Sequence, residues 1–61
     1  MKKWILRKYV PMAVYFKCKD RTGQTSTSSP EDSMNFDTEE QAIDFNHDSL
    51  YGEYEAVPFH F

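Results

Sequence analysis

The chain has 61 residues, a net charge of −3 and an aromatic share of 16%. A chain of this length forms one small domain that buries only about 60% of its unfolded surface, so its large rings must supply much of the core. The single cysteine, Cys18, excludes an intrachain disulfide and a Cys-x-x-Cys zinc site, and no apolar run approaches the roughly 20 residues of a membrane span. A lone thiol without a secretory signal predicts a cytoplasmic protein.

The charges are strongly segregated along the sequence. All seven Lys and Arg residues lie in the first 21 positions with one acid among them, which gives this segment a charge of +6. Residues 22–61 contain the other nine acids and no Lys or Arg, which gives −9. Two interpretations are open: the two parts face each other and neutralise locally, or one of them serves a charged partner.

Two strands are predicted at the start of the chain, over residues 3–10 and 12–19. Both segments are short and rich in β-branched and aromatic residues. Pro11 lies between them and cannot donate a hydrogen bond to a sheet, so it marks a turn, a bulge or an edge. The second segment alternates with a period of two, which predicts one packed face and one aromatic, basic face.

Residues 20–33 are predicted to be a loop, because they are almost wholly Ser, Thr, Gly, Pro and acid. The segment opens with Asp20-Arg21-Thr22-Gly23, the order that a type I turn prefers. A brief strand over residues 24–28 is the alternative. Ser29 followed by Pro30 predicts a single helical turn, since Pro is favoured at the first helical position.

The main helix is predicted over residues 38–50. Thr38 is a good N-cap, and Gln41 stands three residues later, which is the spacing of a capping box. Gly52 is the predicted stop. At 100° per residue, the side of the helix that faces the core contains Ala42, Phe45, Asn46, Ser49 and Leu50, with Ile43 at its margin.

The last strand is predicted over residues 53–61, and Pro58 places it at a sheet edge or a bulge. Its alternation predicts that Val57, Phe59 and Phe61 pack against the helix. The order strand, strand, helix, strand (ββαβ) indicates one small α+β domain. We expect an antiparallel or mixed β-sheet with the single α-helix packed on one face.

The sequence offers no catalytic, metal-binding or cofactor motif. It has no Gly-x-Ser-x-Gly element, and its two glycines cannot build a phosphate-binding loop. Cys18 with His47 or His60 could in principle form a thiol–imidazole pair. Its position on the apolar side of the strand instead predicts a small buried hydrophobe. We therefore expect a non-enzymatic protein without a cofactor or a metal.

An acidic stripe on the predicted helix is the first candidate for a functional surface. Glu40, Asp44 and Asp48 recur every four residues and therefore share a face, with no Lys or Arg on the helix to relieve them. Like charges at this spacing cost about 0.2–0.5 kcal/mol per pair. Asp37 extends the same acidic surface. The stripe is either a solvated face or a docking surface for a basic protein, including one that normally binds phosphates.

A basic and aromatic strand face is the second candidate. On a sheet, rings can stack bases and cations can hold phosphates, so a nucleic-acid-binding module is the alternative function. The opposing interpretation is that the cations are ordinary solvent-facing residues that protect sheet edges. The residues of this candidate set are Trp4, Arg7, Lys8, Tyr9, Tyr15, Lys17 and Lys19.

The segment Met34–Ala42, MNFDTEEQA, and the terminal YEAVP of Tyr54–Pro58 resemble small strand–strand–helix–strand proteins of phage and prophage open reading frames. In those proteins an aromatic residue, a Ser or Thr cap, acids and an Ala open the only helix. The resemblance covers the C-terminal half and carries over no functional residue. It implies a small accessory protein that binds and modulates a host protein, as anti-defence inhibitors do.

These observations predict an interaction protein that acts on a host protein in the host cytoplasm through its acidic helix face. A homodimer is a further expectation, because a small core gains from burial between strand edges of two copies.

Overall fold

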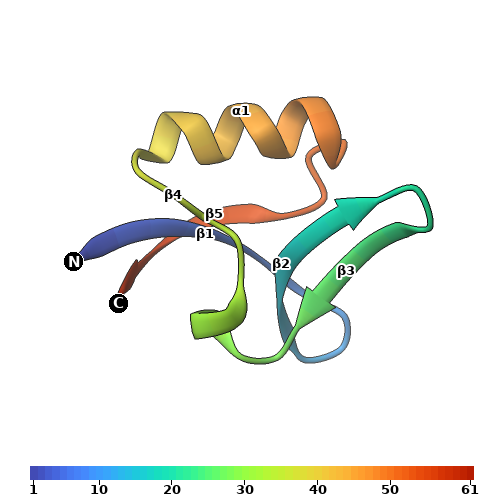
Figure 1. Ribbon diagram of the computed structural model, residues 1–61, viewed down its shortest axis with the longest axis horizontal. Helices are drawn as coiled ribbons and strands as arrows, with labels where there is room; N and C mark the ends of the chain where they lie inside the picture. The colour runs from blue at the N-terminus through green and yellow to red at the C-terminus, as the bar shows by residue number, and fades with distance from the viewer.

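A long antiparallel pairing between the first and last strands organises the fold (Figure 1). In the computed structural model, which describes residues 1–61, β1 (Lys2–Tyr9) pairs along most of its length with β5 (Glu55–His60). On its other side, β1 pairs with β4 (Asn35–Phe36) near its start and with β2 (Ala13–Asp20) near its end. Beyond β2 lies β3 (Gly23–Thr27), which completes a five-stranded antiparallel sheet. The predicted α+β class is confirmed.

One helix, α1 (Glu39–Ser49), lies across one face of this sheet (Figure 1). The Thr38 hydroxyl accepts a hydrogen bond from the backbone N–H of Gln41 at 3.2 Å, so the predicted N-cap is confirmed. The Gln41 side chain accepts from the backbone N–H of Asp37, one residue before the position that a capping box uses. Gly52, with a φ of 73°, follows the helix end as predicted.

The core lies between α1 and the sheet. The Phe16 ring from β2 is at its centre, with ring centroids 5.4 Å from Phe45 and 5.8 Å from Tyr54. The inward side of α1 is therefore the predicted one. The five buried residues that form the core cluster are Leu6, Phe16, Ala42, Leu50 and Tyr54.

The last strand faces the opposite way from the prediction. Leu6 pairs with Ala56 across β1 and β5, and directly paired residues point to the same face of a sheet. Ala56 therefore packs toward α1, whereas Val57 and Phe59 point to the other face. The prediction that Val57, Phe59 and Phe61 pack against the helix is wrong. Alternation shows which residues share a face but not which face the helix covers.

The segment predicted as a loop, residues 20–33, contains regular structure. Gly23–Thr27 form β3, and Pro30–Asp32 form a short 3-10 helix, η1, which confirms the helical turn expected there. The loop prediction is wrong for β3 because this strand is polar and exposed. Backbone hydrogen bonds to β2 hold it in place. Because those bonds involve no apolar side chains, the sequence shows no alternation of apolar and polar residues there.

Cys18 is exposed, contrary to the prediction of a buried thiol. An irregularity between Phe16 and Cys18 leaves Lys17 without a partner on β3, and the inserted residue shifts the alternation of β2. The remainder of β2, from Lys17 to Asp20, is exposed as well. The apolar side of β2 therefore ends at Phe16.

The turn between β2 and β3 is closed by Asp20. Its Oδ1 accepts hydrogen bonds from the Thr22 hydroxyl at 2.6 Å and from the Thr22 backbone N–H at 2.8 Å. These hydrogen bonds lower the pKa of the Asp20 carboxyl. Gly23 follows with a φ of 128°, a conformation that residues with a Cβ rarely adopt.

Replacing this carboxyl by an amide, Asp20→Asn, is expected to weaken the dependence of stability on acid pH. Because the folded-state pKa lies below the unfolded value of about 3.9, the carboxylate stabilises the fold above that pH and loses this effect as the pH falls through the folded pKa. Urea unfolding at about pH 7 and about pH 2.5 measures the change. Thr22→Val, which removes one of the two hydrogen bonds, should give a smaller change in the same direction. A pH dependence equal to that of the unmodified chain would contradict the assignment.

Candidate functional site

The outer face of α1 carries the acidic stripe. Glu40, Asp44 and Asp48 are all exposed, and none forms an ion pair within 4.0 Å. Asp37 differs from them, because it pairs with the Lys3 ammonium. The structure therefore brings three of the four predicted acids together on one unneutralised face and gives the fourth an intramolecular partner.

An aliphatic side chain is exposed beside these acids. Ile43 keeps 49% of its surface in contact with water. It lies three residues after Glu40, so these two side chains are neighbours on the surface of α1. At 100° per residue it lies to one side of the stripe, between the acids and the face that meets the core. The stripe thus has one apolar side chain at its edge, beside Glu40.

Three ion pairs join the basic first part of the chain to its acidic remainder. Each has its cation on β1, so three of the four cations of this strand are paired within the fold, in the way that one of the two interpretations of the charge segregation predicts. The sequence does not show which acid pairs with which cation. The separation of basic and acidic residues along the chain indicates only that such pairs can form. The pairs are Lys3–Asp37, Arg7–Glu55 and Lys8–Glu53.

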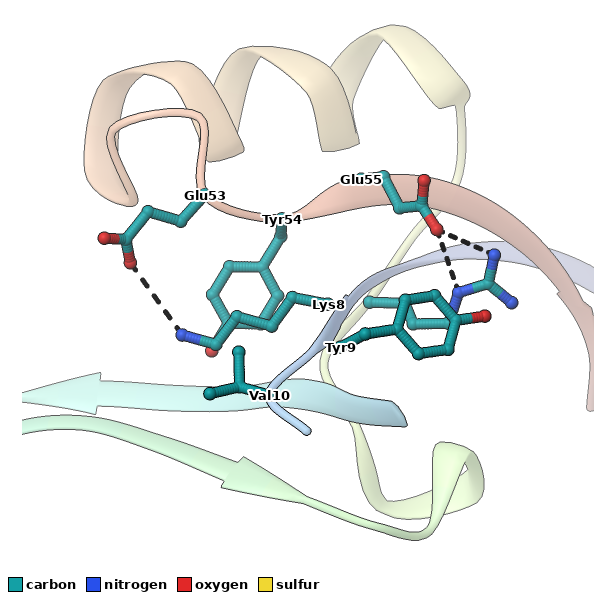
Figure 2. Close-up of a pocket in the computed structure, with 7 residues that line it drawn as sticks. Lys8, Tyr9, Val10, Glu53, Tyr54 and Glu55 are labelled. Carbon is teal, nitrogen blue, oxygen red and sulfur yellow. Dashed lines mark hydrogen bonds and ion pairs between the residues drawn. The ribbon is translucent and has the colours of Figure 1, made fainter. Parts of the chain in front are cut away.

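A groove of about 640 Å³ opens where the end of β1 passes the start of β5 (Figure 2). Figure 2 shows the Tyr54 ring between the two strands, and the Lys8 ammonium lies 4.6 Å from its centroid. Arg7 donates to one Glu55 oxygen from Nη2 at 2.7 Å and from Nε at 3.0 Å. This side-chain hydrogen bonding raises the pKa of Arg7. Both cations of the groove are thus held by carboxylates.

The predicted basic and aromatic set is divided between the two faces of the sheet. Arg7 pairs with Tyr15 across β1 and β2, and Tyr9 is two residues further along β1, so these three share the face opposite α1. The Arg7 guanidinium lies 5.1 Å from the Tyr9 ring centroid. Trp4 and Lys8 point to the helix side, where Trp4 packs against the core.

The last two members of that set lie on the outer half of β2. Lys17 is exposed in the irregular part of the strand. Lys19 donates from Nζ to the Ser49 carbonyl at 3.1 Å, where a cation also complements the negative end of the α1 dipole. The structure therefore does not gather the seven residues into one stacking and phosphate-binding surface.

Comparisons with known proteins give no match to a family model, a curated protein or a solved structure. The fold and its surface define this chain as a small α+β domain with one outward-facing acidic helix. Its single α-helix has 11 residues and is not long and apolar enough to cross a membrane.

Proposed function

We propose that this chain is a small non-enzymatic protein that binds a basic partner protein through the acidic face of α1. Glu40, Asp44 and Asp48 form the centre of that face, and Ile43 adds an apolar contact. The supporting observation is that these three acids are exposed and unpaired. The acids that face β1, in contrast, each have a cation partner.

The physical reason is that the stripe is unfavourable for the isolated helix. Acids at i and i+4 repel each other, and a single lysine among them would relieve the repulsion. A basic surface would turn the same charges into an attraction that steers the two proteins together and fixes their orientation. A solvated face with no partner gains nothing from this arrangement.

The resemblance to phage and prophage accessory proteins leads us to propose that the partner is a host protein in the host cytoplasm. A stripe of regularly spaced carboxylates offers charges to a surface that normally holds phosphates. The partner class we propose is therefore a basic, phosphate-binding protein, whose activity would be modulated when this surface is covered.

Neutralising the stripe with Glu40→Gln, Asp44→Asn and Asp48→Asn together is expected to abolish partner capture from a host lysate. The fold should survive and gain about 0.2–0.5 kcal/mol for each relieved pair, because the like charges are removed. Affinity capture read by mass spectrometry measures binding, and urea unfolding measures stability.

The matched control is Glu39→Gln, Glu53→Gln and Glu55→Gln, which removes the same charge from exposed acids outside the stripe. We expect this variant to retain capture. Capture that persists in the stripe variant, or that is lost equally in the control, would refute the proposed function.

A further inference from the structure

The sheet has two long free edges. β3 pairs only with β2, and β5 pairs only with β1. In an edge strand, alternate residues direct their N–H and C=O groups outward, where another strand can pair with them. Whether an edge accepts a strand depends on the residues along it.

The outer edge of β5 is blocked at its centre. The Phe61 N–H donates to the Met1 carbonyl at 2.9 Å, and the Met1 amino group donates to the Phe61 carbonyl at 3.0 Å, so this pair exchanges both hydrogen bonds. Hydrogen-bonded and non-hydrogen-bonded pairs alternate, which makes Trp4–Pro58 a non-hydrogen-bonded pair with backbone groups that point outward. Pro58 has no N–H, so the free edge lacks a donor there.

The outer edge of β3 has no such protection. Its sequence, GQTST, contains no proline, no lysine and no other charged residue, and Gly23 to Ser26 are exposed. No backbone hydrogen bond outside the strand ladder involves a residue of β3. The threonines favour pairing, because Thr–Thr and Thr–Ser neighbours across strands can form hydrogen bonds.

The two ends of β3 carry opposite charges without partners. Arg21 lies in the turn just before the strand, and Glu31 and Asp32 lie in η1 just beyond it; none of the three forms an ion pair. Figure 1 shows this turn and η1 toward opposite ends of β3. Antiparallel pairing of two copies brings the start of one β3 beside the end of the other. Arg21 of each copy would then approach the acids of its partner.

We infer that β3 pairs antiparallel with β3 of a second copy about a two-fold axis. Such an isologous contact uses both free edges at once and closes, and it joins two five-stranded sheets into one. The contact is narrow and polar, so we expect a weak, concentration-dependent dimer, not an obligate one. This inference goes beyond the proposed function, because it uses β3 and not the acidic face of α1.

Disulfide trapping tests the pairing and its register. In a Cys18→Ser background, single cysteines are placed along the strand by Gln24→Cys, Thr25→Cys or Ser26→Cys, and off its end by Ser28→Cys as the control. Two copies of a residue at the two-fold axis lie opposite each other, within the Cα separation that a disulfide needs. One of the three strand variants should therefore crosslink about tenfold faster than the control, because pairing raises the local thiol concentration. Equal rates in all four variants would overturn the inference.

Charge reversal tests the same contact without a new cysteine. Sedimentation over a range of concentrations should show weaker association for Arg21→Glu, and equally for Glu31→Arg with Asp32→Arg. The variant that combines all three changes should regain association, since each end then meets its complement. Monomers at every concentration, or a combined variant no better than the single reversals, would contradict pairing through β3.

The stripe variant Glu40→Gln, Asp44→Asn and Asp48→Asn separates this inference from the proposed function. It should dimerise like the unmodified chain even though it loses its protein partner. Dimerisation that disappears with the stripe would show that α1 makes the contact and would overturn the role of β3.

Discussion

Phe16→Ala is expected to destabilise the domain by about 3–5 kcal/mol, which is close to the whole stability that a core of this size supplies. The Phe16 side chain is 1% exposed and lies between the rings of Phe45 and Tyr54. Its removal takes away the apolar area that joins β2 to α1 and leaves a cavity that rigid neighbours cannot fill. We therefore expect a substantial unfolded fraction at room temperature.

Urea unfolding followed by Trp4 fluorescence measures this loss, because Trp4 is the one tryptophan and packs against the core. Phe16→Leu keeps most of the volume and should cost much less. Met12→Ala, at a side chain that is 76% exposed, should stay within about 0.5 kcal/mol of the unmodified chain. If Phe16→Ala proved as mild as Met12→Ala, the core would not be where the structure places it.

The elements that could be predicted from the sequence have local causes. Thr38 caps α1 because its hydroxyl reaches an N–H three residues away, and Pro11 separates β1 from β2 because it cannot join a ladder. The acidic stripe is equally local, since a four-residue spacing places Glu40 and Asp44 on one face in any helix. These features required no knowledge of the rest of the fold.

The elements that could not be predicted depend on partners far along the chain. β3 is a strand because β2 pairs with it, and β4 spans two residues held against β1. The burial of Ala56 in place of Val57 follows from the register with Leu6, which sets the side of the sheet that meets α1. A period of two is the same in both orientations, so the sequence pattern alone could not distinguish them.

The candidate surfaces show the same division between local and distant causes. Arg7 and Lys8 looked available for phosphates because their acid partners lie more than 40 residues away. Such exposed pairs contribute little stability, about 0–1 kcal/mol each. They also reduce the free positive charge of β1, whereas the acids of the α1 stripe stay unpaired.

Asn46 makes a contact that the sequence did not indicate. Helical spacing predicts that it faces the core, and its amide also hydrogen-bonds the backbone of Tyr54. Its Nδ2 donates to the Tyr54 carbonyl at 2.6 Å, and its Oδ1 accepts from the Tyr54 backbone N–H at 3.0 Å. Tyr54 is buried and lies just before β5 begins, beyond the last residue that pairs with β1. The Asn46 amide therefore supplies the backbone hydrogen bonds that a neighbouring strand would otherwise supply.

Asn46→Ala is therefore expected to destabilise the domain by about 1–3 kcal/mol for each Tyr54 backbone group that it leaves unpaired. Asn46→Asp should be destabilising at neutral pH for a different reason. A carboxylate can accept from the Tyr54 N–H, but it cannot donate to the Tyr54 carbonyl, and its charge lies against that oxygen.

The two variants should separate when the pH is lowered. The neutral acid can donate, so the fold favours the protonated form and raises the pKa of the introduced carboxyl above its unfolded value of about 3.9. The penalty of Asn46→Asp, relative to the unmodified chain, is then complete above the folded pKa and shrinks as the pH falls through it. Asn46→Ala introduces no titrating group, so its penalty relative to the unmodified chain should not change with pH. Urea unfolding of the three chains between about pH 7 and about pH 3 measures both differences. Parallel losses for Asp and Ala across this range would mean that the amide does not donate to Tyr54.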